Sequence, residues 1–195
     1  MTRSLVVAPQ WIGDAVMAEP LLAALAARGE RLTVAAKIPL RKSTESYDFN
    51  SRTGITAQEF ARLSTGQFVR EMGNVVFFGS YGMGKTHLAS ALTQSLCEAG
   101  FKCLFTTSHG LINELTLAKR DLSLTSLLKR LDRFDVIICD ELGYVPHDPD
   151  GADLFFQLIA QRAERRSLVI TTNLTFSEWE KVFINPRTTA AAVDR

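Results

Sequence analysis

A glycine-rich segment in the middle of the chain has the residue types and the spacing of a phosphate-binding loop. Gly79, Gly84, Lys85 and Thr86 meet the pattern G-x-x-x-x-G-K-T. The glycines let successive backbone N–H groups turn inward around phosphate oxygens, and a following helix adds the positive end of its dipole. Lys85 is suited to reach the β- and γ-phosphates, and the Thr86 hydroxyl to ligate Mg²⁺. The residues expected to bind ATP are Gly79, Ser80, Tyr81, Gly82, Met83, Gly84, Lys85, Thr86 and His87.

Two adjacent carboxylates follow an apolar segment about 55 residues after the loop. In a parallel sheet the ligand crevice lies at the carboxyl ends of the strands, which would place Asp140 and Glu141 beside the phosphates. Asp140 is suited to hold Mg²⁺, and Glu141 to polarise an attacking water as general base. A solvated turn is the alternative for such a pair taken alone. Its place after a phosphate loop favours hydrolysis of the nucleotide.

Asn173 is a third polar residue at the end of an apolar segment, 168–172. Its amide could orient the lytic water and sense the γ-phosphate, whereas an Asx turn at a strand end is the alternative. The order of phosphate loop, Asp-Glu pair and Asn favours the functional interpretation. The residues predicted from these patterns to act in catalysis are Lys85, Glu141 and Asn173.

The elements that must hold these residues alternate between strands and helices. A strand is expected over 74–78 before the loop, and a helix over 86–99 after it. Thr56 and Glu59 have capping-box spacing and predict an amphipathic helix over 56–70. This alternation predicts an α/β fold of the P-loop NTPase class, with a parallel sheet covered on both faces. The other expected strands are 102–106, 135–139 and 167–172, and the other expected helices are 110–119, 122–131 and 153–165.

The chain divides by composition into three parts. Residues 1–36 have the pattern of a short β-α-β appendage, residues 37–55 are a polar and basic linker, and residues 56–195 form the P-loop ATPase domain. The net charge of +1 gives no overall attraction to a polyanion. Three cysteines without metal-ligand spacing argue against a disulfide framework. Because no run is apolar and long enough for a signal peptide or a membrane span, we expect a cytoplasmic protein.

Residues 37–195 resemble the IstB-like ATPases, which are helper proteins of transposition, and more distantly the bacterial replicative-helicase loaders. The resemblance rests on four motifs, 79–87, 140–146, 150–152 and 170–179. It implies an AAA+ three-layer core, ATP-dependent homo-oligomeric assembly on DNA, and cooperation with a transposase. It also implies the roles given above for the phosphate loop and the Asp-Glu pair, with Asn173 as the sensor 1 residue.

Both ends of the chain depart from this resemblance. Arg195 matches the family's arginine finger, which would stabilise charge on a neighbour's ATP, with an ordinary surface arginine as the alternative. The family continues into further helical sequence, so we expect a copy truncated at its carboxyl end. Residues 1–36, above all the motif 8–20, resemble the amino terminus of a lipopolysaccharide heptosyltransferase. Asp14 would match that family's candidate base, but a helix cap is the preferred interpretation, and a gene fusion would explain the segment.

DNA contact would have to come from local basic clusters. Basic groups on helices are mostly solvated, and the residues alone make DNA the less favoured partner, whereas the resemblance predicts non-specific DNA binding. The alternatives that stay open are a helicase-loader-like ATPase, a glycosyltransferase fragment, and an ATP-binding remnant without turnover. The basic clusters are Lys37, Arg41 and Lys42; Lys119 and Arg120; Lys129, Arg130 and Arg133; and Arg162, Arg165 and Arg166.

Overall fold

The computed structural model describes residues 3–8, 31–36, 49, 54–144, 149–183 and 185–193. The predicted arginine finger Arg195, the segment around Asp14, and the basic trio Lys37, Arg41 and Lys42 lie outside the described residues. In the described part of the chain, no helix is both long and apolar enough to cross a membrane.

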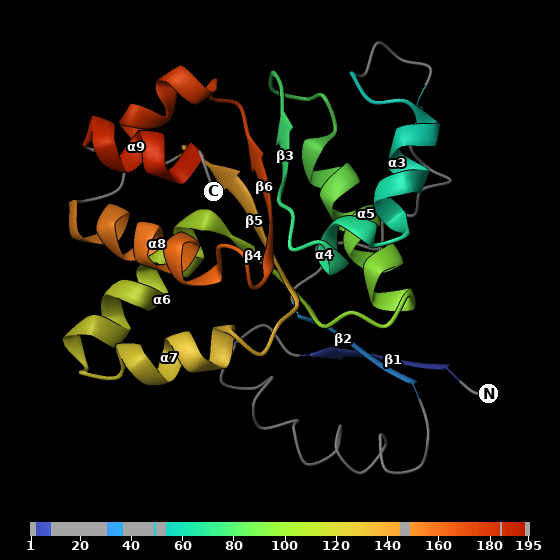
Figure 1. Ribbon diagram of the computed structural model, residues 1–195, viewed down its shortest axis with the longest axis horizontal. Coiled ribbons are helices and arrows are strands. Elements are labelled where there is room, and N and C mark those ends of the chain that lie inside the picture. Colours follow the sequence, from blue (N-terminus) through green and yellow to red (C-terminus); the bar gives the residue numbers. More distant parts are fainter. Residues whose placement is uncertain are drawn as a thin grey trace.

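A parallel β-sheet forms the centre of the fold (Figure 1). Its strand order is β1-β2-β4-β5-β6-β3, and every neighbouring pair is parallel. The strand that precedes the phosphate loop, β3, therefore lies beside β6 and at one edge of the sheet. The parallel α/β fold expected from the sequence is confirmed. The strands are β1 (Arg3–Ala8), β2 (Arg31–Ala36), β3 (Val75–Phe78), β4 (Cys103–Thr107), β5 (Val136–Leu142) and β6 (Ser167–Thr172).

Helices cover both faces of the sheet, which gives three layers (Figure 1). One face packs against α3 (Ala57–Ser64) and α5 (Lys85–Glu98), and the other against α6 (Ser108–Arg120), α7 (Leu124–Leu131) and α8 (Pro149–Arg162). Side chains of a strand alternate between faces. In β5, Val136 and Ile138 accordingly belong to the hydrophobic core on the α3 and α5 side of the sheet. Ile137 and Cys139 belong to the core on the α6, α7 and α8 side.

The helix expected over 56–70 is in fact two helices. Thr56 and Glu59 form the predicted capping box, which starts α3. The chain then turns at Gly66, whose φ of 69° is left-handed, and continues as the short helix α4 (Gln67–Arg70). Glycine adopts this conformation without the steric cost that a side chain brings. The single-helix prediction is therefore wrong at this point.

The last part of the described chain contains two elements that the sequence patterns did not predict. They are the 3-10 helix η2 (Phe176–Lys181) and the helix α9 (Pro186–Val193). Their packing centres on Phe183, whose ring lies 6.1 Å from the rings of both Phe155 in α8 and Trp179 in η2. This aromatic cluster joins the end of the chain to the α8 face of the sheet.

The amino-terminal strands extend the same sheet. β1 pairs with β2 along its whole length, and β2 pairs with β4 at Ala35↔Cys103 and Ala36↔Leu104. Between β2 and α3, the structure describes only residue 49 and residues 54–56. The Phe49 ring packs 5.6 Å from the Phe60 ring of α3.

Candidate functional site

The glycine-rich loop joins the carboxyl end of β3 to the first turn of α5. Gly82 and Gly84 have φ values of 75° and 79°, so both need the left-handed conformation that glycine adopts freely. A Cβ at Gly82 would meet no atom within 4 Å, and its constraint is therefore conformational alone. Gly84 is the N-cap of α5 and has no side chain to bond the first-turn amides. These amides are thus left for another acceptor, as in anion sites at helix ends.

Lys85 folds back over the loop. Its Nζ donates to the main-chain oxygens of Gly79 and Ser80, at 2.8 Å each, and the residue is only 8% exposed. Burial lowers the pKa of the Lys85 ammonium, and the nearby carboxylates of Asp140 and Glu141 oppose this shift. The result is a desolvated cation held at the mouth of the loop.

Asp140 lies against the phosphate loop, although 54 positions separate it from Thr86. The Thr86 hydroxyl donates to Asp140 Oδ1 at 3.1 Å, and the Asp140 side chain is buried. Asp140 is in register with Thr107, the last residue of β4, and Thr86 lies in the first turn of α5. Hydroxyl and carboxylate oxygens are the ligands that Mg²⁺ prefers, so this pair fits a magnesium site.

Glu141 has an unusual backbone. Its φ is 62°, which is rare for a residue with a side chain, and the β5–β6 register shifts between Cys139 and Leu142. The Glu141 side chain is exposed, while its N–H donates to Thr171 Oγ1 at 2.8 Å. The Glu141 carboxylate therefore points away from the packed sheet and toward solvent.

Asn173 comes directly after β6. Its Oδ1 atom is buried, and within the described residues it has no hydrogen-bond partner. A buried amide oxygen without a partner is costly unless a water or a ligand bonds it. The position therefore suits a group that contacts a bound molecule.

Two tyrosines link the loop to the segment after Glu141. The rings of Tyr81 and Tyr144 lie 5.1 Å apart in an edge-on arrangement, with 73° between their planes. Burial is the main cause that raises the pKa of Tyr144. Tyr81 nevertheless remains exposed, so the pair lies at the surface of the site.

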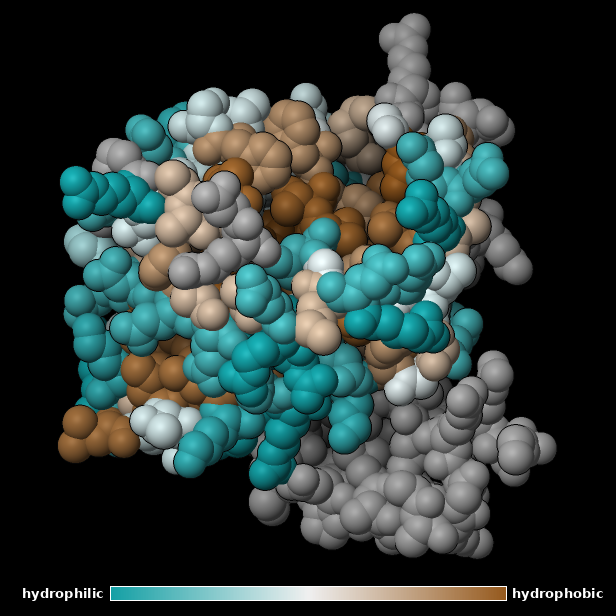
Figure 2. Space-filling model, viewed as in Figure 1, coloured by the Kyte–Doolittle hydropathy of each residue, from teal (hydrophilic) through white to brown (hydrophobic). Residues whose placement is uncertain are grey.

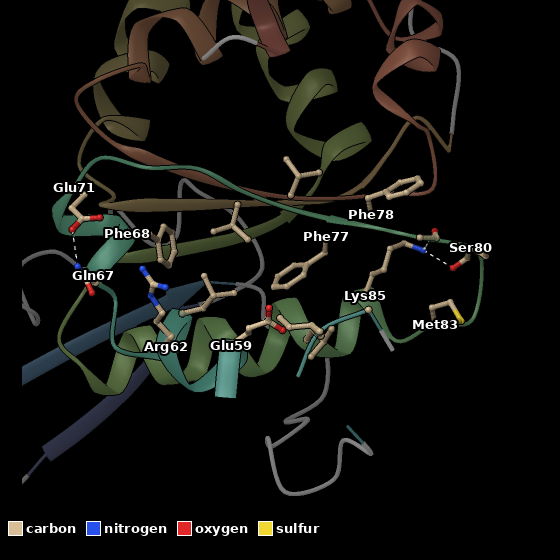
Figure 3. A pocket seen from close by; sticks show the side chains of 17 residues that line it. Glu59, Arg62, Gln67, Phe68, Glu71, Phe77, Phe78, Ser80, Met83 and Lys85 are labelled. Atoms are coloured by element: carbon tan, nitrogen blue, oxygen red, sulfur yellow. Dashed lines mark hydrogen bonds between the residues drawn. The ribbon is translucent and has the colours of Figure 1, made fainter. Parts of the chain in front are cut away.

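A cavity of about 730 Å³ adjoins the phosphate loop between β3, α3 and α4. Figure 3 shows Lys85, Ser80 and Met83 at one end of this pocket and Phe68, Gln67 and Glu71 at the other. Phe77 lies between these two groups. On the surface, apolar side chains gather in a hollow in the upper half of the face in Figure 2, while hydrophilic ones cover much of the rest. The sequence patterns did not indicate this pocket, because it depends on how the consecutive elements α3, α4, β3 and α5 within residues 54–88 pack against one another.

The structure brings Lys85, Thr86 and Asp140 together, and places Glu141 and Asn173 at the carboxyl ends of the neighbouring strands β5 and β6. One basic residue is misassigned by sequence: Arg162, grouped with exposed basic residues as a possible DNA contact, is 1% exposed and bonds main-chain oxygens. The prediction is wrong for this residue because its position on α8 faces the core. Three other members of the clusters form ion pairs, namely Lys119 with Asp150, Arg165 with Asp132, and Arg166 with Asp135.

A parallel α/β sheet whose edge strand runs into a phosphate loop, beside an acidic strand end, is the fold of the AAA+-type P-loop class. The family model described as "IstB-like ATP binding protein" matches residues 2–195, and the chain belongs to this family. The match includes the amino-terminal segment, and the likeness of residues 1–36 to a heptosyltransferase stays a prediction.

Related proteins agree with this assignment. The chain is 39% identical over 169 residues to an insertion-sequence ATP-binding protein of Sinorhizobium fredii, covering 86% of this chain and 57% of the relative. It is 38% identical to the ATP-binding protein of insertion sequence IS232 from Bacillus thuringiensis, covering 80% and 63%. The chain therefore spans about three fifths of the length of these relatives.

Solved structures share the fold. The crystal structure of DnaI superposes with a TM-score of 0.66 and 22% identity, covering 82% of this chain and 88% of that one. The replication initiator DnaA, bound to AMPPCP and single-stranded DNA, gives a TM-score of 0.67 with 13% identity, covering 80% and 48%. At these identities the likeness concerns the fold alone.

Proposed function

We propose that this protein binds and hydrolyses ATP as a helper of DNA transposition. The observation that carries the proposal is the hydrogen bond from Thr86 to Asp140, which joins the phosphate loop to the acidic end of β5. It puts a hydroxyl and a carboxylate side by side, next to the exposed carboxylate of Glu141. Hydrolysis of a nucleoside triphosphate needs this combination of phosphate cradle, magnesium ligands and base.

The residues divide the chemistry between them. Lys85 exchanges its two main-chain acceptors for phosphate oxygens, while the loop amides and the start of α5 hold the rest of the phosphate chain. Thr86 and Asp140 hold Mg²⁺, which when bound neutralises charge that develops during phosphoryl transfer. Glu141 accepts a proton from the attacking water, and Asn173 orients that water through its unpaired amide oxygen.

The cavity beside the loop suits the base and the ribose. It shares Gly79, Ser80, Met83 and Lys85 with the phosphate site and continues over the apolar surface of Phe77. Nucleotide pockets are mostly apolar with a few polar groups at fixed positions. Glu59 and Arg62 of α3 supply polar groups to the wall of this cavity, on the side of Phe77 away from Lys85 (Figure 3).

The partners follow from the family. The relatives are ATP-binding proteins of insertion sequences, and we propose that this chain likewise acts with a transposase on DNA, non-specifically, in the cytoplasm and as a homo-oligomer when ATP is bound. Arg195 would then act on the ATP of a neighbouring copy. For residues 1–36, the motif 8–20 supports an origin in a glycosyltransferase gene.

The test is the ATPase rate with and without duplex DNA. We expect Lys85→Ala to weaken ATP binding by roughly 10- to 100-fold, because a charge-assisted hydrogen bond to phosphate is lost. Glu141→Gln should still bind ATP but turn over about 100-fold more slowly, because it lacks the base. The exposed residues Lys102 and Glu180 provide the matched controls Lys102→Ala and Glu180→Gln.

Equal turnover by the wild type and by Glu141→Gln would refute the base assignment. ATP turnover that survives Lys85→Ala would place the activity elsewhere. Capture of a replicative helicase instead of a transposase would favour a helicase-loader role for the same site.

A further inference from the structure

The hydroxyl of Thr171 lies between the two acidic residues of the site. Its Oγ1 donates to Asp140 Oδ1 at 2.5 Å and accepts the Glu141 N–H at 2.8 Å. Thr171 and Asp140 are both buried, at 1% and 3% exposure. One side chain of β6 therefore bonds the expected magnesium ligand and the backbone of the expected base at the same time.

This contact replaces a regular strand-to-strand bond. The register of β5 against β6 is interrupted between Cys139 and Leu142, and Glu141 adopts a left-handed φ of 62° within this interruption. Such a conformation is unfavourable for a residue with a side chain and persists only where surrounding contacts hold it. The hydrogen bond from the Glu141 N–H to Thr171 is such a contact.

The same hydroxyl limits the rotation of the Asp140 carboxylate. Thr86 precedes Asp140 in the sequence and Thr171 follows it, and the hydroxyls of both threonines donate to Asp140 Oδ1. Two donors on one oxygen fix the plane of the carboxylate and direct the other oxygen, Oδ2, elsewhere. A metal ligand that is held by a second group in this way binds more tightly and in a defined direction.

We propose that Thr171 is a positioning residue that orients Asp140 and Glu141 together. This role rests on the proposed function, because it assumes a nucleotide and Mg²⁺ at the site. Through one hydroxyl, the Asp140 carboxylate is aimed at the metal and the Glu141 backbone is held so that its carboxylate points out of the sheet. Loss of the hydroxyl therefore weakens metal-assisted binding and turnover in parallel.

The neighbouring residue Thr172 provides a matched control. It is equally buried in β6, and its hydroxyl donates to Leu142 O at 2.8 Å and accepts the Leu174 N–H at 3.1 Å. Within the part of the chain that the structure describes, Thr172 thus makes the same number of side-chain hydrogen bonds as Thr171, but to main-chain groups only. If Thr171 had a purely structural role, replacing either threonine by valine would have the same effect on Mg²⁺-dependent ATP affinity and on turnover.

The experiment compares Thr171→Val, Thr171→Ser and Thr172→Val with the wild type. For each, the Kd for ATP is measured by calorimetry with Mg²⁺ and with EDTA, and the unfolding midpoint and kcat are recorded. We expect Thr171→Val to lose about 5- to 10-fold of the Mg²⁺-dependent gain in affinity and to turn over at least about tenfold more slowly, while its Kd in EDTA stays within about twofold. Thr171→Ser keeps the hydroxyl and should therefore retain the Mg²⁺-dependent gain in affinity and the turnover of the wild type. Thr172→Val should lower the unfolding midpoint but retain the Mg²⁺-dependent gain in affinity.

The positioning role is overturned if Thr171→Val keeps the full Mg²⁺ gain, or if it loses no more than Thr172→Val does. A wild-type chain whose ATP affinity does not respond to Mg²⁺ would overturn it as well, since no metal ligand would then need orienting. If the wild type binds Mg²⁺ and ATP together but does not turn ATP over, the proposed hydrolysis fails, whereas the affinity measurements still decide the role of Thr171.

Discussion

Strands β5 and β6 carry buried polar groups at both of their ends, and the two ends use them differently. At the amino ends, the Arg162 guanidinium donates to the main-chain oxygens of Leu131, Phe134, Asp135 and Ser167 over 2.9–3.3 Å. Burial lowers the pKa of Arg162 to about 10, so the group remains charged at neutral pH. This cluster ties α7, β5, α8 and β6 to one another.

At the carboxyl ends, the polar groups retain capacity for a ligand. The Asn173 amide oxygen is buried without a partner among the described residues, the Glu141 carboxylate is exposed, and the first-turn amides of α5 face the loop. Among the described residues, Lys85 Nζ donates only to main-chain oxygens of the loop, which phosphate oxygens can replace. Burial of a charge therefore does not by itself mark a functional site. Arg162 keeps one unpartnered nitrogen, Nε, among the described residues, but its two terminal nitrogens bond main-chain oxygens from several packed segments. A functional site is marked instead by buried and exposed polar groups that converge on a phosphate-binding loop.

The largest effect is expected at the amino ends. Arg162→Met removes four hydrogen bonds and leaves buried main-chain oxygens without a donor, so the free energy of unfolding should fall by about 3 kcal/mol or more. Urea unfolding measures this loss. A decrease below about 1 kcal/mol would mean that the cluster does not hold the strands, and the comparison of the two ends would fail.

An intermediate effect is expected at the carboxyl ends. Asn173→Ala removes an amide oxygen that bonds no described protein group, so the free energy of unfolding should change little. ATP turnover should fall about tenfold, because the lytic water loses an orienting group. Single-turnover kinetics beside urea unfolding separate the two quantities. A variant that is strongly destabilised but turns over normally would make Asn173 a structural residue.

The smallest effect is expected for Arg166, which lies four residues after Arg162, beyond the end of α8, and pairs with Asp135 at 2.9 Å. Both side chains of this pair are partly exposed, at 39% and 29%. Arg166→Met should therefore cost less than about 1 kcal/mol, and the loss should shrink further in high salt. A loss as large as that of Arg162→Met, unchanged by salt, would show that the main-chain hydrogen bonds of Arg162 are not what stabilises this end.

The sequence could predict the polar groups at the carboxyl ends of β5 and β6 better than those at the amino ends. The spacing of the phosphate loop and the Asp-Glu pair depends on local chemistry, and a parallel sheet brings strand ends together without further information. The expected strand 167–172 agrees with β6, Ser167–Thr172, residue by residue. The helix expected over 153–165 instead begins at Pro149 and ends at Arg162.

Long-range contacts could not be predicted. Arg162 has the charge of a surface residue, and only the packing of α8 onto the sheet turns it toward four carbonyl oxygens. Thr171 likewise has the residue type of an ordinary strand position, and its role depends on the register shift in β5. Gly66, which breaks the expected helix over 56–70, packs so closely to Phe101 that an added Cβ would lie 2.2 Å from that ring.

One measurement tests the contrast between the two ends directly: the shift of the unfolding transition by Mg²⁺ and ATP in Lys85→Ala and in Arg162→Met. A ligand at about 100 times its Kd stabilises the folded state by about 2.7 kcal/mol. We predict that Lys85→Ala unfolds like the wild type without ATP and that its stabilisation by the same ligand concentration falls to about 0.4–1.4 kcal/mol, as a 10- to 100-fold weaker Kd requires. Arg162→Met should unfold earlier and keep the full shift. A full shift in Lys85→Ala, or a lost shift in Arg162→Met with unchanged stability, would contradict the assignment of ligand binding to the carboxyl ends and of structural support to the amino ends.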